Sequence, residues 1–394
     1  MPFEARIAAM SNAPKELLPE LLFPFLDLRA QYAAMRNEVL DAISGVLESQ
    51  HFILGPEVRS LEEEIAAFVD VRDAVSCASG SDSLLLALMA LRVGPGDEVI
   101  TTPFTFVATA GSVARLGAKP VFVDIQPDTF NIDPNQIESA ITSRTRAIIP
   151  VHLFGLMSDL DPILRAANMR NIYVIEDAAQ ALGARYRKRS AGSIGKIGCF
   201  SFFPSKNLGA AGDGGIMTTD DAALADRLRV LRSHGAKKKY YSEFIGMNSR
   251  LDALQAAILK VKLRYLPSWV LGRQRKAERY KILIEEFGLQ RQVTLPSSAE
   301  RYVHAYNQFT IRVSKRDHLR DFLRTRGIPV EIYYPYPLHL QPAFAYLGYG
   351  QGAFPQSEAA CNEVLSLPVY PELEEQNQVA VVRAIAEFFN TARA

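Results

Sequence analysis

The sequence contains few cysteines, and their placement excludes two kinds of protein. Among 394 residues only Cys77, Cys199 and Cys361 are cysteine, and they never form a C-x-x-C pair. Neither a disulfide framework nor a zinc ribbon is therefore expected. The six histidines include no H-E-x-x-H pair, so we expect no metal site. Such sparse cysteine usage favours a reducing compartment, and we expect a cytoplasmic protein.

Long apolar runs and an excess of charge are also missing. The formal net charge is +1 at pH 7, which offers no general attraction to nucleic acid or anionic lipid. No apolar run is long enough to cross a bilayer. Residues 1–22 mix charged with apolar side chains, unlike the apolar core of a signal peptide. We therefore expect small-molecule partners, with no nucleic acid and no membrane.

Two glycine motifs for nucleotide phosphates are absent as well. The chain has no G-x-G-x-x-G and no G-x-x-x-x-G-K-[ST], and Gly192, Gly195 and Gly198 repeat at a different spacing. A dinucleotide-binding protein or a P-loop protein would need one of these fingerprints.

What the sequence does contain is an alternation of short apolar runs and longer helical patterns. This alternation predicts an α/β fold with a mainly parallel sheet covered on both faces. The predicted strands are 73–78, 98–102, 120–124, 146–152, 172–176 and 214–219. The predicted helices between and after them are 81–92, 105–116, 134–141, 159–168 and 220–232.

The pattern changes near Pro267, where we expect the helix 251–266 to stop. A long charged helix at 272–287 then leads to a smaller α+β region, with a strand at 306–313 and a helix at 316–326. Because 394 residues are too many for one ordinary core, two domains are expected. We predict an N-terminal arm at 1–24, a large domain at 25–266 and a small C-terminal domain at 267–394.

Lys206 and Asp177 are the residues that carry the clearest chemistry. Lys206 lies between aromatic residues and a run of glycines, which suggests burial, and a buried amine has a lowered pKa and becomes a nucleophile. Asp177 ends an apolar strand, where open α/β sheets place ligand-binding groups. An amine and a carboxylate are the groups that pyridoxal phosphate (PLP) most needs from a protein. A solvent-exposed lysine and a capping aspartate are the alternative interpretations.

A possible phosphate site lies at residues 79–83 (SGSDS), which follow a predicted strand and open a helix. Backbone N–H groups at a helix N-terminus attract anions such as phosphate. The same residue types also form an ordinary N-cap, so the pattern leaves both interpretations open.

Taken together, five segments resemble the DegT/DnrJ/EryC1/StrS family of PLP-dependent nucleotide-sugar aminotransferases. The resemblance extends from Phe25 to the last helix. The segments are 79–84 (SGSDSL), 103–109 (PFTFVAT), 176–180 (EDAAQ), 201–207 (SFFPSKN) and 247–252 (MNSRLD). The resemblance implies fold type I, the aspartate-aminotransferase-like architecture, with a mainly parallel sheet in the large domain and a smaller α+β C-terminal domain.

The resemblance also implies roles for individual residues. Lys206 holds the cofactor covalently, and Asp177 pairs with its pyridine nitrogen. The further cofactor-binding residues that it implies are Gly80, Ser81, Phe106, Gln180, Ser201 and, across a homodimer interface, Asn248. The substrate-binding residues that it implies are Arg250, Tyr333, Tyr334 and His339.

The activity implied by this resemblance is amino transfer from an amino-acid donor, by analogy glutamate, to a keto-sugar linked to a nucleoside diphosphate. A cyclitol ketone as acceptor, or a non-catalytic regulatory protein that binds PLP, are the alternatives. Many relatives have a histidine where this chain has Tyr333, so the sequence leaves the sugar open, with a lean towards a C3 ketone. His51 and His152 are interpreted as structural histidines.

Overall fold

A seven-stranded sheet forms the centre of the computed structural model, which describes residues 20–297 and 299–391. The strand order is β1-β9-β8-β5-β4-β2-β3. Strand β9 runs antiparallel to both neighbours, and the other neighbouring pairs are parallel. The bounds are β1 Asp73–Cys77, β2 Glu98–Thr101, β3 Lys119–Phe122, β4 Thr145–Ile148, β5 Tyr173–Asp177, β8 Ile197–Ser201 and β9 Gly215–Thr219. This mainly parallel sheet confirms the predicted α/β class.

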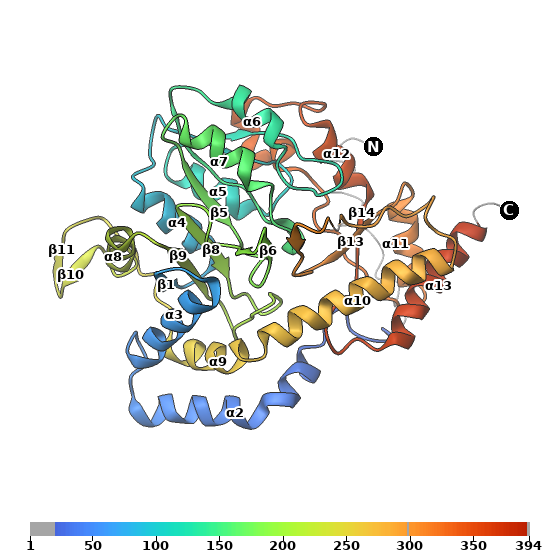
Figure 1. Cartoon of the computed structure of the whole chain (residues 1–394), viewed down its shortest axis with the longest axis horizontal. Helices are drawn as coiled ribbons and strands as arrows, with labels where there is room; N and C mark the ends of the chain where they lie inside the picture. The colour runs from blue at the N-terminus through green and yellow to red at the C-terminus, as the bar shows by residue number, and fades with distance from the viewer. Residues whose placement is uncertain (1–19, 298, 392–394) are drawn as a thin grey trace.

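Helices cover both faces of this sheet (Figure 1). Helix α4 packs against β8, β9, α5 and α8, which explains why it is apolar on nearly all sides. Most residues of the sheet strands are likewise buried, since a mainly parallel sheet is covered on both faces. The bounds are α4 Gly80–Ala90, α5 Val107–Arg115, α6 Pro134–Ala140, α7 Leu160–Asn168 and α8 Ala222–Leu231.

Two N-terminal helices, α2 (Leu28–Ser49) and α3 (Pro56–Val69), pack against α9 (Ala253–Leu263). In Figure 1, α2 lies at the outer edge of the molecule, beyond α9. Residues 1–19 of the predicted N-terminal arm lie outside the described residues. Within the arm, the backbone N–H of Leu22 donates to the carbonyl of Gly327 at 2.9 Å, and Phe23 is buried in the C-terminal core.

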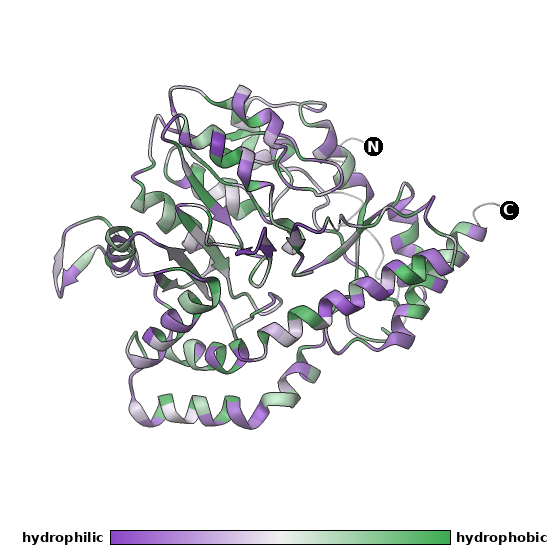
Figure 2. Cartoon of the chain, in the orientation of Figure 1, coloured by the Kyte–Doolittle hydropathy of each residue, from purple (hydrophilic) through white to green (hydrophobic). Residues whose placement is uncertain are grey.

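The C-terminal part forms its own hydrophobic core around a two-stranded antiparallel sheet of β13 and β14. The long helix α10 reaches this core from below the central sheet, alternating hydrophobic and hydrophilic residues along its length (Figures 1 and 2). The elements of this C-terminal part are α10 Leu266–Glu286, β13 Phe309–Arg312, α11 Arg316–Arg324, α12 Pro355–Glu363, β14 Val364–Leu367 and α13 Glu375–Thr391. The domain boundary at residue 267 stays a prediction.

Smaller elements complete the fold. They are β6 Arg185–Tyr186, β7 Arg189–Ser190, β12 Tyr302–Val303, the hairpin β10 Ala236–Lys238 and β11 Tyr241–Ser242, and the 3-10 helices η1 Leu153–Gly155, η2 Leu338–Leu340 and η3 Pro342–Leu347. The hairpin projects beyond α8, away from the rest of the chain (Figure 1). No helix within residues 20–297 and 299–391 combines the length and apolar character that a bilayer span requires.

The structure corrects the prediction made for Pro267. This proline does not stop a helix but lies in the first turn of α10, after a break that follows Leu263. The first turn tolerates proline because its N–H groups have no partner within the helix. The predicted strand 146–152 is also shorter, because β4 ends at Ile148 and Val151 forms only an isolated bridge with Asp177.

Candidate active site

A cavity of about 440 Å³ lies where the parallel strands of the central sheet end. The end of β5 contributes Asp177, the end of β8 contributes Ser201, and the loop after β8 contributes Lys206. The first turn of α4 and the start of α5 form further parts of the wall, and Tyr333 and Tyr334 come from the C-terminal part of the chain. Ligands bind at this edge in open α/β sheets, so the cavity is the candidate site.

Lys206 is positioned by a tight turn after β8. Its backbone N–H donates to the carbonyl of Phe203 at 2.8 Å, and that of Ala210 donates to Phe202 at 2.7 Å. Gly209 allows this turn to close, because a Cβ there would lie 2.2 Å from the carbonyl oxygen of Pro204. The lysine side chain is half-buried and lines the cavity.

The surroundings of Lys206 make its amine reactive. Burial lowers its pKa from 10.5 to about 8, although the nearby charge of Asp177 acts in the opposite direction. At pH 7 the fraction of neutral amine is then about 300-fold larger than for an ordinary lysine. A neutral amine is the form that attacks a carbonyl carbon.

Asp177 is a buried carboxylate held by two donors. Thr109 donates its hydroxyl to Oδ2 at 2.8 Å, and the backbone N–H of Ala179 donates to Oδ1 at 3.2 Å. Burial raises the pKa of Asp177 above its usual value, and the hydrogen bond from Thr109 only partly opposes this shift. The ionised carboxylate is therefore unfavourable until a cation enters the cavity beside it.

The N-terminus of α4 forms another part of the cavity wall. Ser79 caps the helix by accepting a hydrogen bond from the backbone N–H of Asp82 at 3.1 Å, while Gly80 and Ser81 form the first turn. Gly80 packs directly against Ser201, and a Cβ at position 80 would lie 2.5 Å from the Cβ of Ser201. The close contact between Gly80 and Ser201 brings the serines Ser81 and Ser201 together at the N-terminus of α4. Hydroxyl groups at a helix N-terminus suit a phosphate group.

Aromatic and amide side chains also line the cavity. Gln180 accepts from the backbone N–H of Phe154 at 2.7 Å and donates to the hydroxyl of Tyr334 at 3.3 Å. The ring of Phe106 lies 6.2 Å from that of Tyr334 and remains 55% exposed. Burial, and then the charge of Asp177, raise the pKa of Tyr334. Phe106 therefore offers a flat apolar surface to a ring bound in the cavity.

Three residues that the resemblance placed at the site do not line this cavity. Asn248 is exposed on the segment that follows the β10–β11 hairpin. Arg250 is half-buried, and its Nε has no hydrogen-bond partner among the described residues. His339 is buried, lies 3.1 Å from the carboxylate of Glu358 and packs against Phe354. Their roles towards cofactor or substrate stay predictions.

Other residues line the cavity although no sequence motif indicates them as cavity residues. These residues include Thr109, His152, Asp213 and Gln308. Thr109 was part of the segment 103–109, but no local signal indicates which of its threonines faces a carboxylate 68 residues away. Gln308 directly precedes β13 in the C-terminal part, and only the tertiary fold brings it to this edge.

The sequence as a whole matches a known family. The model of the DegT/DnrJ/EryC1/StrS aminotransferase family matches residues 33–386. The chain is 51% identical over 366 residues to the "pleiotropic regulatory protein" of Geobacillus stearothermophilus, covering 93% of this chain and 98% of that protein. It is 47% identical over 362 residues to the UDP-N-acetyl-3-dehydro-alpha-D-glucosamine 3-aminotransferase of Acidithiobacillus ferrooxidans, covering 92% and 96%.

Solved structures agree with this match. DesV of S. venezuelae, in complex with a ketimine intermediate, superposes with a TM-score of 0.90 at 43% identity, covering 93% of this chain and 98% of DesV. The ntda protein of Bacillus subtilis, with bound cofactor PMP, superposes with a TM-score of 0.84 at 33% identity, covering 93% and 85%. Since the family model and these relatives span most of its length, the chain belongs to the DegT/DnrJ/EryC1/StrS aminotransferase family.

Proposed function

We propose that this chain is a PLP-dependent aminotransferase that transfers an amino group to a keto-sugar linked to a nucleoside diphosphate. The observation that carries the proposal is the cavity that brings together the amine of Lys206, whose pKa is lowered, and the buried carboxylate of Asp177. Family membership and the named relatives support the same activity.

The residues around the cavity fit PLP. Asp177 supplies an anion for the pyridine nitrogen, and Lys206 supplies the amine for the aldehyde. Gly80, Ser81 and Ser201 surround a helix N-terminus suited to the phosphate, and Phe106 offers a surface for the ring. When bound, PLP supplies an aldehyde that carries nitrogen between two substrates and a ring that accepts electrons. The ntda structure with PMP, the form that carries the amino group, supports this assignment.

Lys206 moves the protons of the reaction. In its neutral form, Nζ takes the proton from the α-carbon of the amino-acid donor. The resulting ammonium group would deliver that proton to the cofactor carbon that bears the transferred nitrogen. In the second half of the reaction, the neutral Nζ would take a proton from that carbon and deliver it to the former carbonyl carbon of the acceptor. Asp177 would keep the ring nitrogen of bound PLP cationic, and Thr109 fixes the direction of the Asp177 carboxylate.

The substrates are proposed as glutamate and a sugar with a C3 ketone. The Acidithiobacillus ferrooxidans relative is named for a 3-dehydro sugar and amination at position 3, which supports C3 over C4. Tyr333, Tyr334 and Gln308 form the C-terminal wall of the cavity, where a sugar would lie. The nucleotide stays open in this proposal.

A regulatory role without turnover is the second candidate, favoured by the name of the Geobacillus stearothermophilus relative. Such a protein need not keep a lysine able to transfer protons, whereas Lys206, Asp177 and Gln180 all line the cavity here. The site therefore favours catalysis over binding alone.

A substrate panel separates these candidates. UDP- and dTDP-linked sugars with a ketone at C3 or C4, and a cyclitol ketone, are each incubated with PLP, the protein and glutamate. We expect 2-oxoglutarate and an amino-sugar only with nucleotide-linked acceptors, and mostly with a C3 ketone, with the amino position assigned by NMR. Amination of the cyclitol alone would overturn the proposed acceptor. A protein that binds PLP but aminates none of these acceptors would favour the regulatory role.

We also propose a homodimer with shared active sites, as the family resemblance implies. Large exposed hydrophobic side chains gather on α2, on the loop after it and on the hairpin region, including Tyr32, Ile53, Tyr240 and Ile245. Ile245 is 90% exposed and is close in sequence to exposed Tyr241 and Phe244, and a group of exposed apolar side chains is typical of an interface. Asn248 follows the hairpin and is itself exposed, as a residue that reaches a neighbouring subunit must be.

Mixing two inactive variants tests the shared site. Lys206→Ala and Asn248→Ala are expected to be inactive separately, but a heterodimer has one site with both Lys206 and the partner's Asn248 intact. After subunit exchange, we expect about a quarter of wild-type activity per subunit, since half of the dimers are mixed and each has one complete site.

The matched control for this mixture is Lys206→Ala with Asp177→Asn. Both residues line the cavity of one chain, so mixing these variants creates no complete site and should restore nothing. Absence of recovery in the first mixture, with mixed dimers demonstrated by mass spectrometry, would show that each site is built within one chain.

A further inference from the structure

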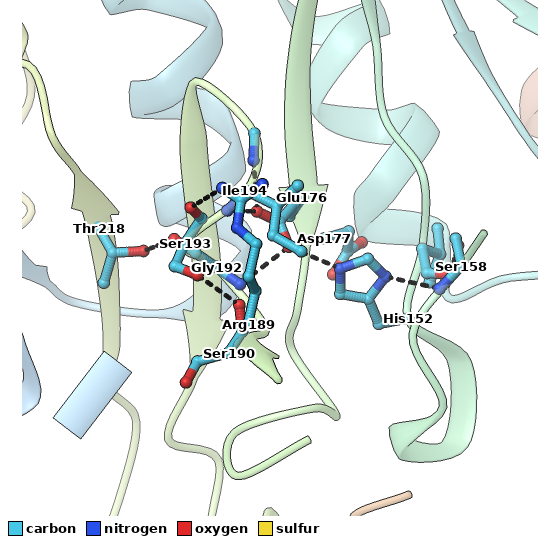
Figure 3. Close-up of polar contacts among 12 residues, drawn as sticks. His152, Ser158, Glu176, Asp177, Arg189, Ser190, Gly192, Ser193, Ile194 and Thr218 are labelled. Carbon is cyan, nitrogen blue, oxygen red and sulfur yellow. Dashed lines mark hydrogen bonds and ion pairs between the residues drawn. The ribbon is translucent and has the colours of Figure 1, made fainter. Parts of the chain in front are cut away.

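A second buried acid lies directly behind the proposed cofactor site. Glu176 precedes Asp177 on β5 but points to the opposite side of the strand, where its carboxylate oxygen Oε2 lies 2.8 Å from Nε2 of His152 (Figure 3). Both side chains are completely buried. Neither residue has a part in the mechanism described above, yet His152 is among the residues that line the cavity.

Glu176 accepts hydrogen bonds from four donors. Besides His152, the backbone N–H groups of Gly192, Ile194 and Gly195 donate to its two oxygens at 2.9, 2.7 and 2.6 Å. Burial alone would raise the pKa of Glu176, but the hydrogen bond from His152 and the hydrogen bonds from the backbone N–H groups of Gly195 and Gly192 outweigh it and lower this pKa. The residue is therefore an ionised carboxylate that only accepts hydrogen bonds.

These contacts fix the proton of His152 on one nitrogen. Nδ1 accepts from the backbone N–H of Ser158 at 3.2 Å, so it carries no proton (Figure 3). The ring proton is then on Nε2 and is donated to Glu176. Both nitrogens are occupied, and His152 has no nitrogen left for acid–base chemistry with a substrate.

The same histidine holds the end of β5. Its backbone N–H donates to the carbonyl of Asp177 at 2.9 Å, and the N–H of Asp177 donates to Pro150 at 3.0 Å. Segment 150–152 follows β4, whose regular pairing with β5 ends at Ile148. This segment therefore holds the backbone of Asp177 in place through these two hydrogen bonds. The ring of His152, clamped between Ser158 and Glu176, anchors that segment.

We propose that Glu176 and His152 form a positioning pair for amino transfer, which fixes the carboxylate of Asp177 against the cofactor's ring nitrogen. The pair acts by geometry and by charge. The carboxylate of Glu176 is a second negative charge next to Asp177. The four hydrogen-bond donors to Glu176 compensate this charge. This inference rests on the proposed PLP-dependent function, and it assigns residues that support Asp177 rather than contact substrate.

Glu176→Gln tests the pair because an amide has the size of the carboxylate but the wrong hydrogen-bonding groups. Its NH₂ group would face the N–H donors of His152 or of the 192–195 turn. Moving the ring proton to Nδ1 would only relocate the conflict to the N–H of Ser158. The variant therefore disturbs the histidine without removing volume.

The main readout is the pH midpoint of the visible absorbance of bound PLP, which reports protonation of the nitrogen that joins it to Lys206. A ring nitrogen less firmly paired with Asp177 carries less positive charge, which makes that joining nitrogen more basic. In Glu176→Gln we expect the midpoint to rise by about one pH unit. We also expect kcat to fall roughly 10- to 100-fold, with KM for the donor little changed. The titratable side chains around the pair are Asp177, Cys199, Lys206 and Tyr334.

A double-mutant cycle distinguishes a pair from two separate structural residues. His152→Phe keeps a ring but removes both nitrogens, and we expect the midpoint of Glu176→Gln, of His152→Phe and of the double variant to be the same. Glu358→Gln is the matched control, because Glu358 and His339 form another histidine–glutamate contact that does not line the cavity. This control should leave the absorbance midpoint unchanged, whatever it does to the melting temperature.

Two outcomes would overturn the inference. One is a Glu176→Gln protein that binds PLP with the wild-type midpoint and wild-type kcat and loses only thermal stability. The other, which needs no variant to fold well, is ¹⁵N NMR of the cofactor-free wild type showing His152 doubly protonated or protonated on Nδ1. A wild-type protein that fails to bind PLP at all would instead contradict the proposed function.

Discussion

Replacing Lys206 by alanine is expected to abolish amino transfer and to leave the fold intact. The change removes both the amine that holds PLP and the base that moves protons, so we expect turnover to fall by roughly 10⁴-fold or more. Borohydride reduction followed by mass spectrometry measures the covalent link, which should be present on Lys206 in the wild type and absent in the variant. Because burial of the lysine charge is unfavourable, the melting temperature of the cofactor-free variant should not fall.

The lowered pKa of Lys206 adds a pH dependence to this prediction. In the cofactor-free protein the amine changes from charged to neutral as the pH rises through about 8. Covalent capture of PLP should therefore accelerate between pH 7 and pH 9 and then level off, about two and a half pH units below the midpoint of an ordinary lysine. Capture that rises only above pH 10 would show that the amine is solvated.

Lys262 provides the matched control for Lys206. It is also half-buried with a pKa lowered by burial to about 8, but its amine donates to the backbone carbonyl of Gly209 and does not line the cavity. Lys262→Met should keep the covalent link to PLP, which would show that position in the cavity, and not a lowered pKa alone, selects the lysine. A link that survives in Lys206→Ala and disappears in Lys262→Met would reverse the assignment.

The sheet could be predicted from the sequence because its strands are short apolar runs separated by clear turn signals. Strand 73–78, for example, is observed as Asp73–Cys77. Pro267 was misinterpreted for a physical reason, since proline ends a helix in its interior but is accommodated in a first turn. The sequence alone does not show whether a proline ends one helix or begins the next. That choice requires the position of the break at residues 264–265.

The site could be predicted where chemistry is carried by a single residue in a distinctive setting. Lys206 and Asp177 stand out for this reason, and the structure places both at one cavity. Thr109 and the Glu176–His152 contact could not be predicted in this way, because each depends on a partner many residues away. His339 is a different case, because its side chain is buried against Glu358 and does not line the cavity, and the substrate role that the resemblance implies for it stays a prediction.

Asp177→Asn is expected to keep PLP bound but to slow turnover by roughly two to four orders of magnitude. Asparagine has nearly the same shape and can still accept the hydrogen bond from Thr109, so the cavity should be preserved. The variant loses the negative charge that keeps the ring nitrogen cationic, and removing one partner of a buried ion pair costs about 3–5 kcal/mol. Stopped-flow measurement of the half-reaction with glutamate alone isolates this loss from sugar binding.

A graded series then separates charge from geometry at Asp177. Thr109→Val keeps the carboxylate but removes the donor that orients it. We expect the rate of the half-reaction to fall roughly tenfold, the size of one hydrogen bond to a charged group.

Burial raises the pKa of Asp177 in the cofactor-free protein, so the carboxylate is lost as the pH falls through that raised value. Wild-type uptake of PLP should therefore weaken on the acid side, whereas uptake by Asp177→Asn, which has no carboxylate to protonate, should lack that step. A half-reaction in Asp177→Asn as fast as in the wild type would show that another group holds the ring nitrogen cationic.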